Sequence, residues 1–134
     1  DVRLSRGLGD VYKRQHEFNP PHWHGGLYSF VIWMKIPYSW SEQIKLPQFQ
    51  TTKIEDRKAG MFEFEYSDTR GETRSLSYQL SPDFEGCMCF FPAWMRHCVY
   101  PFFGTDEERV SISGNIWFTP GTSAGKGFGK KKGR

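Results

Sequence analysis

The sequence has few cysteines and lacks any long apolar run. Its three cysteines, an odd number, are Cys87, Cys89 and Cys98, and all lie among apolar residues rather than in spaced loops. This usage excludes a disulfide-rich secreted scaffold and predicts a reducing, cytoplasmic setting. Apolar runs such as residues 30–34 are far shorter than the roughly twenty residues of a membrane-spanning helix. We therefore expect no membrane partner.

The interior of the sequence also lacks an excess of positive charge. Residues 1–15 hold four basic and two acidic groups, and residues 121–134 hold five basic groups and no acidic one. Residues 16–120 hold the other nine Lys/Arg and thirteen Asp/Glu, so their net charge is −4, although the whole chain carries +3. This distribution excludes a basic nucleic-acid-binding surface on the globular part, and we expect no nucleic-acid partner.

The two ends of the chain differ from its middle. Residues 10–15, Asp-Val-Tyr-Lys-Arg-Gln, match the in-frame translation of a transposase mosaic-end adapter used in sequencing libraries, so we expect residues 1–15 to be an artefactual or disordered leader. Residues 121–134 are rich in glycine and lysine and cannot bury apolar area, which predicts a disordered basic tail. Residues 16–120 are predicted to form one domain, because 37% apolar and 17% aromatic content suffices for a core.

Periodicity in this middle part predicts strands and little helix. Residues 26–36 are apolar on both faces, as a central buried strand is. In residues 60–66, Glu63 and Glu65 alternate with aromatic residues, which predicts one wet and one packed face. Further strands are predicted at 74–80, 87–91, 97–100 and 108–118, and a turn of helix at 40–45. Many short antiparallel strands separated by turns indicate an all-β sandwich or barrel, and we favour a jelly roll.

The last two predicted strands carry a polar stripe. If residues 97–100 and 108–118 form a hairpin centred on Phe103, His97 lies opposite Arg109, and the two side chains share one side of the sheet. The polar stripe, defined as Arg109, Ser111, Ser113 and Asn115, interrupts an otherwise apolar strand and predicts a polar pocket. The alternative for Arg109 is a surface ion pair with the neighbouring Glu107 or Glu108.

A second motif, His22-Trp23-His24, directly precedes the predicted central strand. Histidines at positions i and i+2 of extended backbone project to one side, so both imidazoles can reach one metal ion. A third histidine from a neighbouring strand completes one face of an octahedron and leaves the opposite face open for a bidentate co-substrate and dioxygen. This is the arrangement of the facial triad in non-haem iron enzymes.

Together, these motifs carry a family resemblance. The order His22-x-His24, Phe91-Pro92-x-Trp94-x-x-His97 and Arg109-x-Ser111-x-Ser113-x-Asn115 resembles the 2-oxoglutarate- and Fe(II)-dependent oxygenases common in phage and bacterial genomes, which are relatives of prolyl hydroxylases. The resemblance covers about residues 19–118. It implies a double-stranded β-helix (jelly roll) oxygenase domain over residues 16–120, and we expect an N-terminal helical layer to be missing from it.

The resemblance also implies roles for individual residues. It assigns His22 and His97 to Fe(II) and Arg109 to the distal carboxylate of 2-oxoglutarate, for which a planar guanidinium provides a bidentate grip. Ser111 and Asn115 are expected to help bind the co-substrate. The wider superfamily usually has His-x-Asp or His-x-Glu, whereas this chain has His24 at the position of the carboxylate. Either His24 ligates in its place, or the triad is incomplete and halide or water fills the site; we predict the set His22, His24 and His97.

The expected activity is that of an Fe(II)- and 2-oxoglutarate-dependent dioxygenase of the hydroxylase type. It would couple the decarboxylation of 2-oxoglutarate by dioxygen to the oxidation of an unknown organic or peptidyl substrate, with the polar stretch 38–58 as a lid. One alternative is a non-catalytic jelly-roll binding or structural module. Another is a cupin-type metal dioxygenase that does not use 2-oxoglutarate. A third is a zinc site formed by Cys87 and Cys89 with His97 or Cys98.

Overall fold

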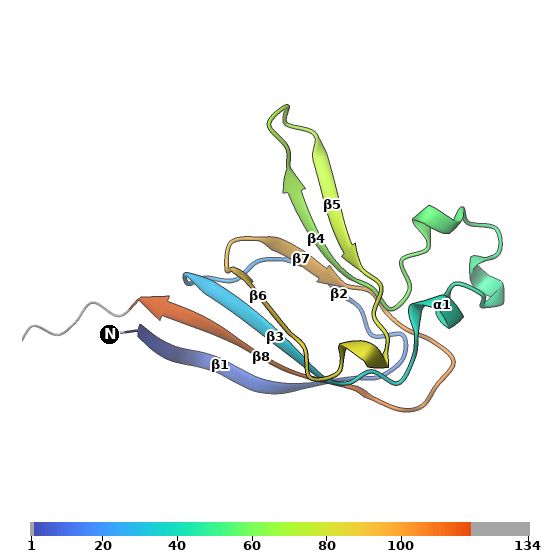
Figure 1. Cartoon of the computed structure of the whole chain (residues 1–134), viewed down its shortest axis with the longest axis horizontal. Helices are drawn as coiled ribbons and strands as arrows, with labels where there is room; N and C mark the ends of the chain where they lie inside the picture. The colour runs from blue at the N-terminus through green and yellow to red at the C-terminus, as the bar shows by residue number, and fades with distance from the viewer. Residues whose placement is uncertain (1, 119–134) are drawn as a thin grey trace, which may run out of the picture.

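The chain folds into two four-stranded antiparallel sheets that face each other (Figure 1). The computed structural model describes residues 2–118, so the predicted tail 121–134 lies outside the described residues. The first sheet has the order β1 (Val2–Lys13), β8 (Arg109–Phe118), β3 (Tyr28–Lys35), β6 (Met88–Pro92). The second has the order β2 (Asn19–His22), β7 (Arg96–Val99), β4 (Phe62–Ser67), β5 (Thr73–Tyr78). The prediction of an all-β, jelly-roll-like fold is confirmed.

Helix is scarce in the described part of the chain. A four-residue helix α1 (Trp40–Gln43) and the 3-10 turns η1 (Pro47–Phe49), η2 (Ile54–Asp56) and η3 (Pro82–Phe84) interrupt the connections between strands. None of the described helices has the length and apolar character needed to cross a bilayer. The predicted strands all appear, with ends displaced by at most two residues, and β3 is a central strand between β8 and β6 as expected.

The predicted hairpin between residues 97–100 and 108–118 is wrong. β7 pairs with β2 and β4, whereas β8 pairs with β1 and β3, so the two strands belong to different sheets. The connection 100–108 crosses from one sheet to the other, and its buried Phe102 holds it inside the protein. The predicted register assumed a tight turn at Phe103 that reverses the chain within one sheet. Among the described strands, only β4 and β5 are consecutive neighbours in one sheet.

The predicted wet face of β4 is also wrong at Glu63. This side chain is 3% exposed and accepts hydrogen bonds from Lys58, Ser77 and Tyr100, which cover the outer face of the strand. Conversely, Tyr66, predicted to pack, is 45% exposed because the β4–β5 hairpin extends beyond the start of β7 at Arg96. The alternation in residues 60–66 assigned the side chains to the two faces of β4 correctly. It did not predict which neighbouring residues cover each face.

The inner faces of both sheets form an aromatic core. Trp33 of β3 and Phe91 of β6 pack from one sheet against Phe62 and Phe64 of β4 from the other. Residues 2–13, where we expected an artefactual or disordered leader, form β1 along the edge of β8. Strand pairing is a property of the backbone and says nothing about the origin of a segment, so the adapter assignment and the domain boundaries stay predictions.

Candidate metal and co-substrate site

A cavity of about 260 Å³ lies between the two sheets. Its walls come from β1, β3, β6 and β8 on one side and from β2, β4 and β7 on the other. The polar residues among its lining are Lys13, Asn19, His22, His24, Ser29, His97, Arg109, Ser111, Ser113 and Asn115. His97 and Arg109 therefore do meet at one pocket. They reach it from facing sheets, not from opposed positions in one hairpin.

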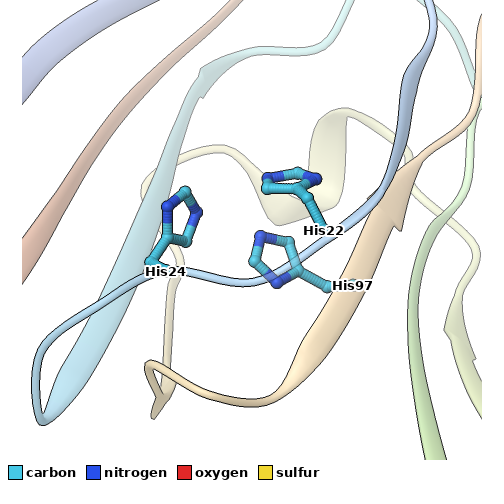
Figure 2. Close-up of side chains that lie close together, drawn as sticks. All are labelled: His22, His24 and His97. Atoms are coloured by element: carbon cyan, nitrogen blue, oxygen red, sulfur yellow. The ribbon is translucent and has the colours of Figure 1, made fainter.

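Three histidines converge at one end of this cavity (Figure 2). His22 lies opposite His97 in the β2–β7 register, and their ring centroids are 4.3 Å apart. His24 follows directly after β2, where its backbone N–H donates to Ala93 O at 2.9 Å. The nitrogen ligand atoms of the three rings all lie within 4.8 Å of one another. The motif His22-x-His24 and the more distant His97 thus form one cluster, although their roles as ligands stay predictions.

Backbone carbonyls determine which ring nitrogen of two of these histidines is free. His22 Nδ1 lies 2.7 Å from Pro20 O, and His97 Nδ1 lies 3.0 Å from Met95 O. A carbonyl oxygen can only accept, so each Nδ1 carries a hydrogen and donates it, which in the neutral ring leaves the lone pair on Nε2. Such bonds from the second nitrogen orient metal-ligating histidines in proteins.

The protonation of the cluster also suits a metal. Burial lowers the pKa of His97 to about 4, and the hydrogen bond to Met95 does not offset this. Burial, followed by the proximity of His22, also lowers the pKa of His24. Both rings are therefore neutral at pH 7, the form in which imidazole binds a metal. The donor set fits a divalent transition metal such as Fe(II).

The cluster contains no carboxylate and no thiol among the residues that the structure describes. Cys87 is exposed. Cys98 lies opposite Glu63 in the β4–β7 register, and its side chain is buried near the Glu63 carboxylate. The thiolate zinc site that the sequence left open therefore has no support from the geometry of these cysteines.

Arg109, the first residue of β8, is 3% exposed and lines the same cavity. Its Nη1 donates to the Tyr38 hydroxyl at 2.9 Å, and its Cζ lies 5.5 Å from the centre of the Phe102 ring. Among the described side chains, no carboxylate forms an ion pair with it. Its neighbours Glu107 and Glu108 pair with Lys35 and Arg14 instead. The alternative of a surface ion pair for Arg109 is therefore wrong.

Sequence reasoning missed the residues that hold this guanidinium. Tyr38 is buried, donates to Gly60 O at 2.8 Å and stacks on Phe102 with ring centroids 4.7 Å apart. Gly60 has a φ of +69°, and a Cβ there would lie 2.4 Å from the Tyr38 ring, so only glycine leaves room for the tyrosine. No local pattern in the sequence marks these contacts, because they join segments far apart in the chain.

The rest of the polar stripe lines the cavity as its alternation predicted. Asn115 Oδ1 accepts a hydrogen bond of 2.5 Å from the buried Ser29 hydroxyl, which leaves the two N–H groups of the amide for the cavity. Ser29 was missed because a single serine in an apolar strand gives no signal by itself.

The expected lid is not over the cavity. No residue of 38–58 belongs to the cavity lining, and Figure 1 shows α1 and the following turns beside the sandwich. The segment packs instead against the connection 100–108, where Gln43 bonds to the backbone of Phe103. It is an insertion at the edge of the sandwich, the other common structure for a long polar segment within a compact domain.

Comparison with known proteins adds one finding. The family model described as "Putative 2OG-Fe(II) oxygenase" matches residues 10–115, a range that contains the histidine cluster and the polar stripe. No curated protein and no solved structure matches the chain significantly.

Proposed function

Because the chain belongs to this family of 2-oxoglutarate- and Fe(II)-dependent oxygenases, we propose that it is a dioxygenase of the hydroxylase type. In this proposal it couples the decarboxylation of 2-oxoglutarate to the oxidation of a substrate that is a small organic molecule or a peptidyl group. Dioxygen is the second co-substrate. The three free cysteines suit a place in the cytoplasm.

The observation that carries this proposal is the buried guanidinium of Arg109. A buried charge is costly unless an opposite charge balances it, and among the described side chains none does. A ligand with a carboxylate at the right distance from the metal would supply the missing charge. The planar fork of the guanidinium suits a bidentate, charge-assisted bond to that carboxylate.

We assign His22, His24 and His97 to Fe(II) and thereby propose that His24 takes the place of the usual carboxylate. Three neutral imidazoles leave the full charge of the ion to attract the anionic 2-oxo acid end of the co-substrate. When bound, Fe(II) supplies the dioxygen chemistry that oxidises the 2-oxo acid to succinate and carbon dioxide.

The chain itself holds and shields the reactants. Arg109 fixes the far end of the diacid, and the Ser111 hydroxyl donates to the same carboxylate. Asn115 also lines the cavity, and its N–H groups donate to an oxygen of the bound ligands. The rings of Trp33, Phe62 and Phe91 make the remaining wall apolar, which excludes water and strengthens these bonds.

The test is turnover of 2-oxoglutarate without added substrate. Purified protein with Fe(II), dioxygen and ascorbate, which takes up the oxidising equivalent in place of a substrate, should convert 2-oxoglutarate slowly to succinate, and Arg109→Gln should abolish this conversion. Zinc in place of iron should give none. Metal binding without any consumption of 2-oxoglutarate would favour the structural module, and metal-dependent oxygen uptake that is independent of 2-oxoglutarate would favour the cupin-type enzyme.

A further inference from the structure

The insertion 38–58 contains a buried amide that the proposed chemistry does not use. Gln43, the last residue of α1, is 5% exposed. Its Nε2 donates to Phe103 O at 2.8 Å, and its Oε1 accepts from Phe103 N at 2.8 Å. The side chain therefore pairs with both backbone groups of one residue, as a neighbouring strand would. Two bonds at one peptide unit restrain its orientation as well as its position.

Phe103 directly follows Phe102, the residue against which Arg109 packs. The ring of Phe102 is fully buried, stacks on Tyr38 and lies under the guanidinium of Arg109. A shift of the backbone at Phe103 moves the ring of Phe102 and, with it, the surface that supports the cation. The insertion thus touches Arg109 from two sides, through the Tyr38 hydroxyl and through the connection that Gln43 holds.

We propose that Gln43 is a positioning residue for Arg109, so that the insertion sets the affinity of the site for the distal carboxylate of the 2-oxo acid. This inference rests on the proposed function. A carboxylate accepts two parallel bonds from a guanidinium only when the planes of both groups are aligned, so a small tilt of the side chain loses part of the grip. The 2-oxo acid end, which lies at the histidines, does not depend on this alignment.

The test compares two ligands that differ only at the distal end. Binding of 2-oxoglutarate and of 2-oxobutyrate, which lacks the distal carboxylate, is measured by anaerobic titration of the Fe(II)-loaded protein. In Gln43→Leu, the preference for the diacid should fall by about tenfold, the equivalent of roughly one hydrogen bond. The affinity for 2-oxobutyrate and the affinity for Fe(II) should not change. Hydrogen exchange at the Phe103 amide should become faster in the variant.

Gln50→Leu is the matched control. Gln50 lies in the same insertion, and its amide donates to the carbonyls of residues 44–46, within the insertion itself. Its substitution should lower the thermal stability without changing the preference for the diacid. If Gln43→Leu does not fold, Gln43→Glu keeps the shape and the acceptor for Phe103 N but loses the donor, and it should shift the preference in the same direction.

A double substitution separates positioning from general stability. In an Arg109→Gln background, Gln43→Leu should have no further effect on 2-oxoglutarate binding. A lowered melting temperature with an unchanged ligand preference would overturn the role of Gln43 and leave the proposed function intact. No preference for the diacid in the unmodified protein would instead refute the role of Arg109, and the inference about Gln43 would fail with it.

Discussion

Two charged side chains of this protein are buried to the same extent but have opposite surroundings. Glu63 on β4 and Arg109 on β8 are each 3% exposed. Lys58 Nζ lies 2.6 Å from the Glu63 carboxylate, and the hydroxyls of Ser77 and Tyr100 donate to the same group. Among the described side chains, Arg109 contacts only a neutral phenol and the face of an aromatic ring. Burial alone therefore does not indicate a binding site, and the role proposed for Arg109 rests on burial without a balancing charge.

Because of this difference, we expect Glu63 to contribute to stability and Arg109 to contribute to ligand binding. The Glu63 cluster is complete without a ligand, so its residues should affect folding and leave the affinity for 2-oxoglutarate unchanged. No described anion lies beside Arg109, so its replacement should affect ligand binding and cost little stability.

The largest effect is expected for Arg109→Gln. Loss of a bidentate, charge-assisted pair should weaken 2-oxoglutarate binding about a thousandfold, which corresponds to ~4 kcal/mol. The melting temperature should stay the same or rise, because a buried unbalanced charge is removed. Calorimetric titration and thermal unfolding measure the two quantities. Arg74→Gln, in an exposed ion-pair network of the β4–β5 hairpin, is the control and should change neither. Strong destabilisation by Arg109→Gln would show that the arginine is structural.

Glu63→Ala should have the reverse effect. It leaves Lys58 without its partner in a partly buried position, and we expect the free energy of unfolding to fall by about 3 kcal/mol. The affinity for 2-oxoglutarate should be unchanged once the protein is folded. Chemical denaturation gives the first value. Glu65→Ala, which removes a more exposed ion pair with Arg96, should cost about 0.5 kcal/mol. A loss of ligand affinity in Glu63→Ala would contradict the assignment of Glu63 to stability and of Arg109 to binding.

The smallest effect concerns pH. Burial alone would raise the pKa of Glu63, but Lys58, Ser77 and Tyr100 outweigh it and lower the pKa below its ordinary value. The unfolded chain therefore binds a proton at a higher pH than the folded protein does. The stability from this carboxylate is present above about pH 4.5 and is lost as pH falls through the folded pKa. Unfolding of the unmodified protein and of Glu63→Gln should differ at pH 7 and converge toward pH 3. A constant difference would refute this cause.

The sequence predicts the strands and the pocket-lining stripe well because both depend on local alternation. Residues 28–35 and 109–118 show their faces in their own order of residues, and His22 and His24 share a side through their spacing alone. The pairing of β7 and β8 could not be read in this way, because a long connection can return within a sheet or cross to the facing one. Tyr38, Gln43 and the partners of Glu63 depend on contacts between distant segments, for which a single sequence contains no periodic signal.

The most direct test of the central claim is an anaerobic titration of the purified protein with Fe(II) and then with 2-oxoglutarate. We expect a visible metal-to-ligand charge-transfer band that saturates at one equivalent of each. In Arg109→Gln the band should require far more 2-oxoglutarate, and in His97→Ala it should be absent. The absence of any band in the unmodified protein, together with tight binding of zinc, would contradict the account.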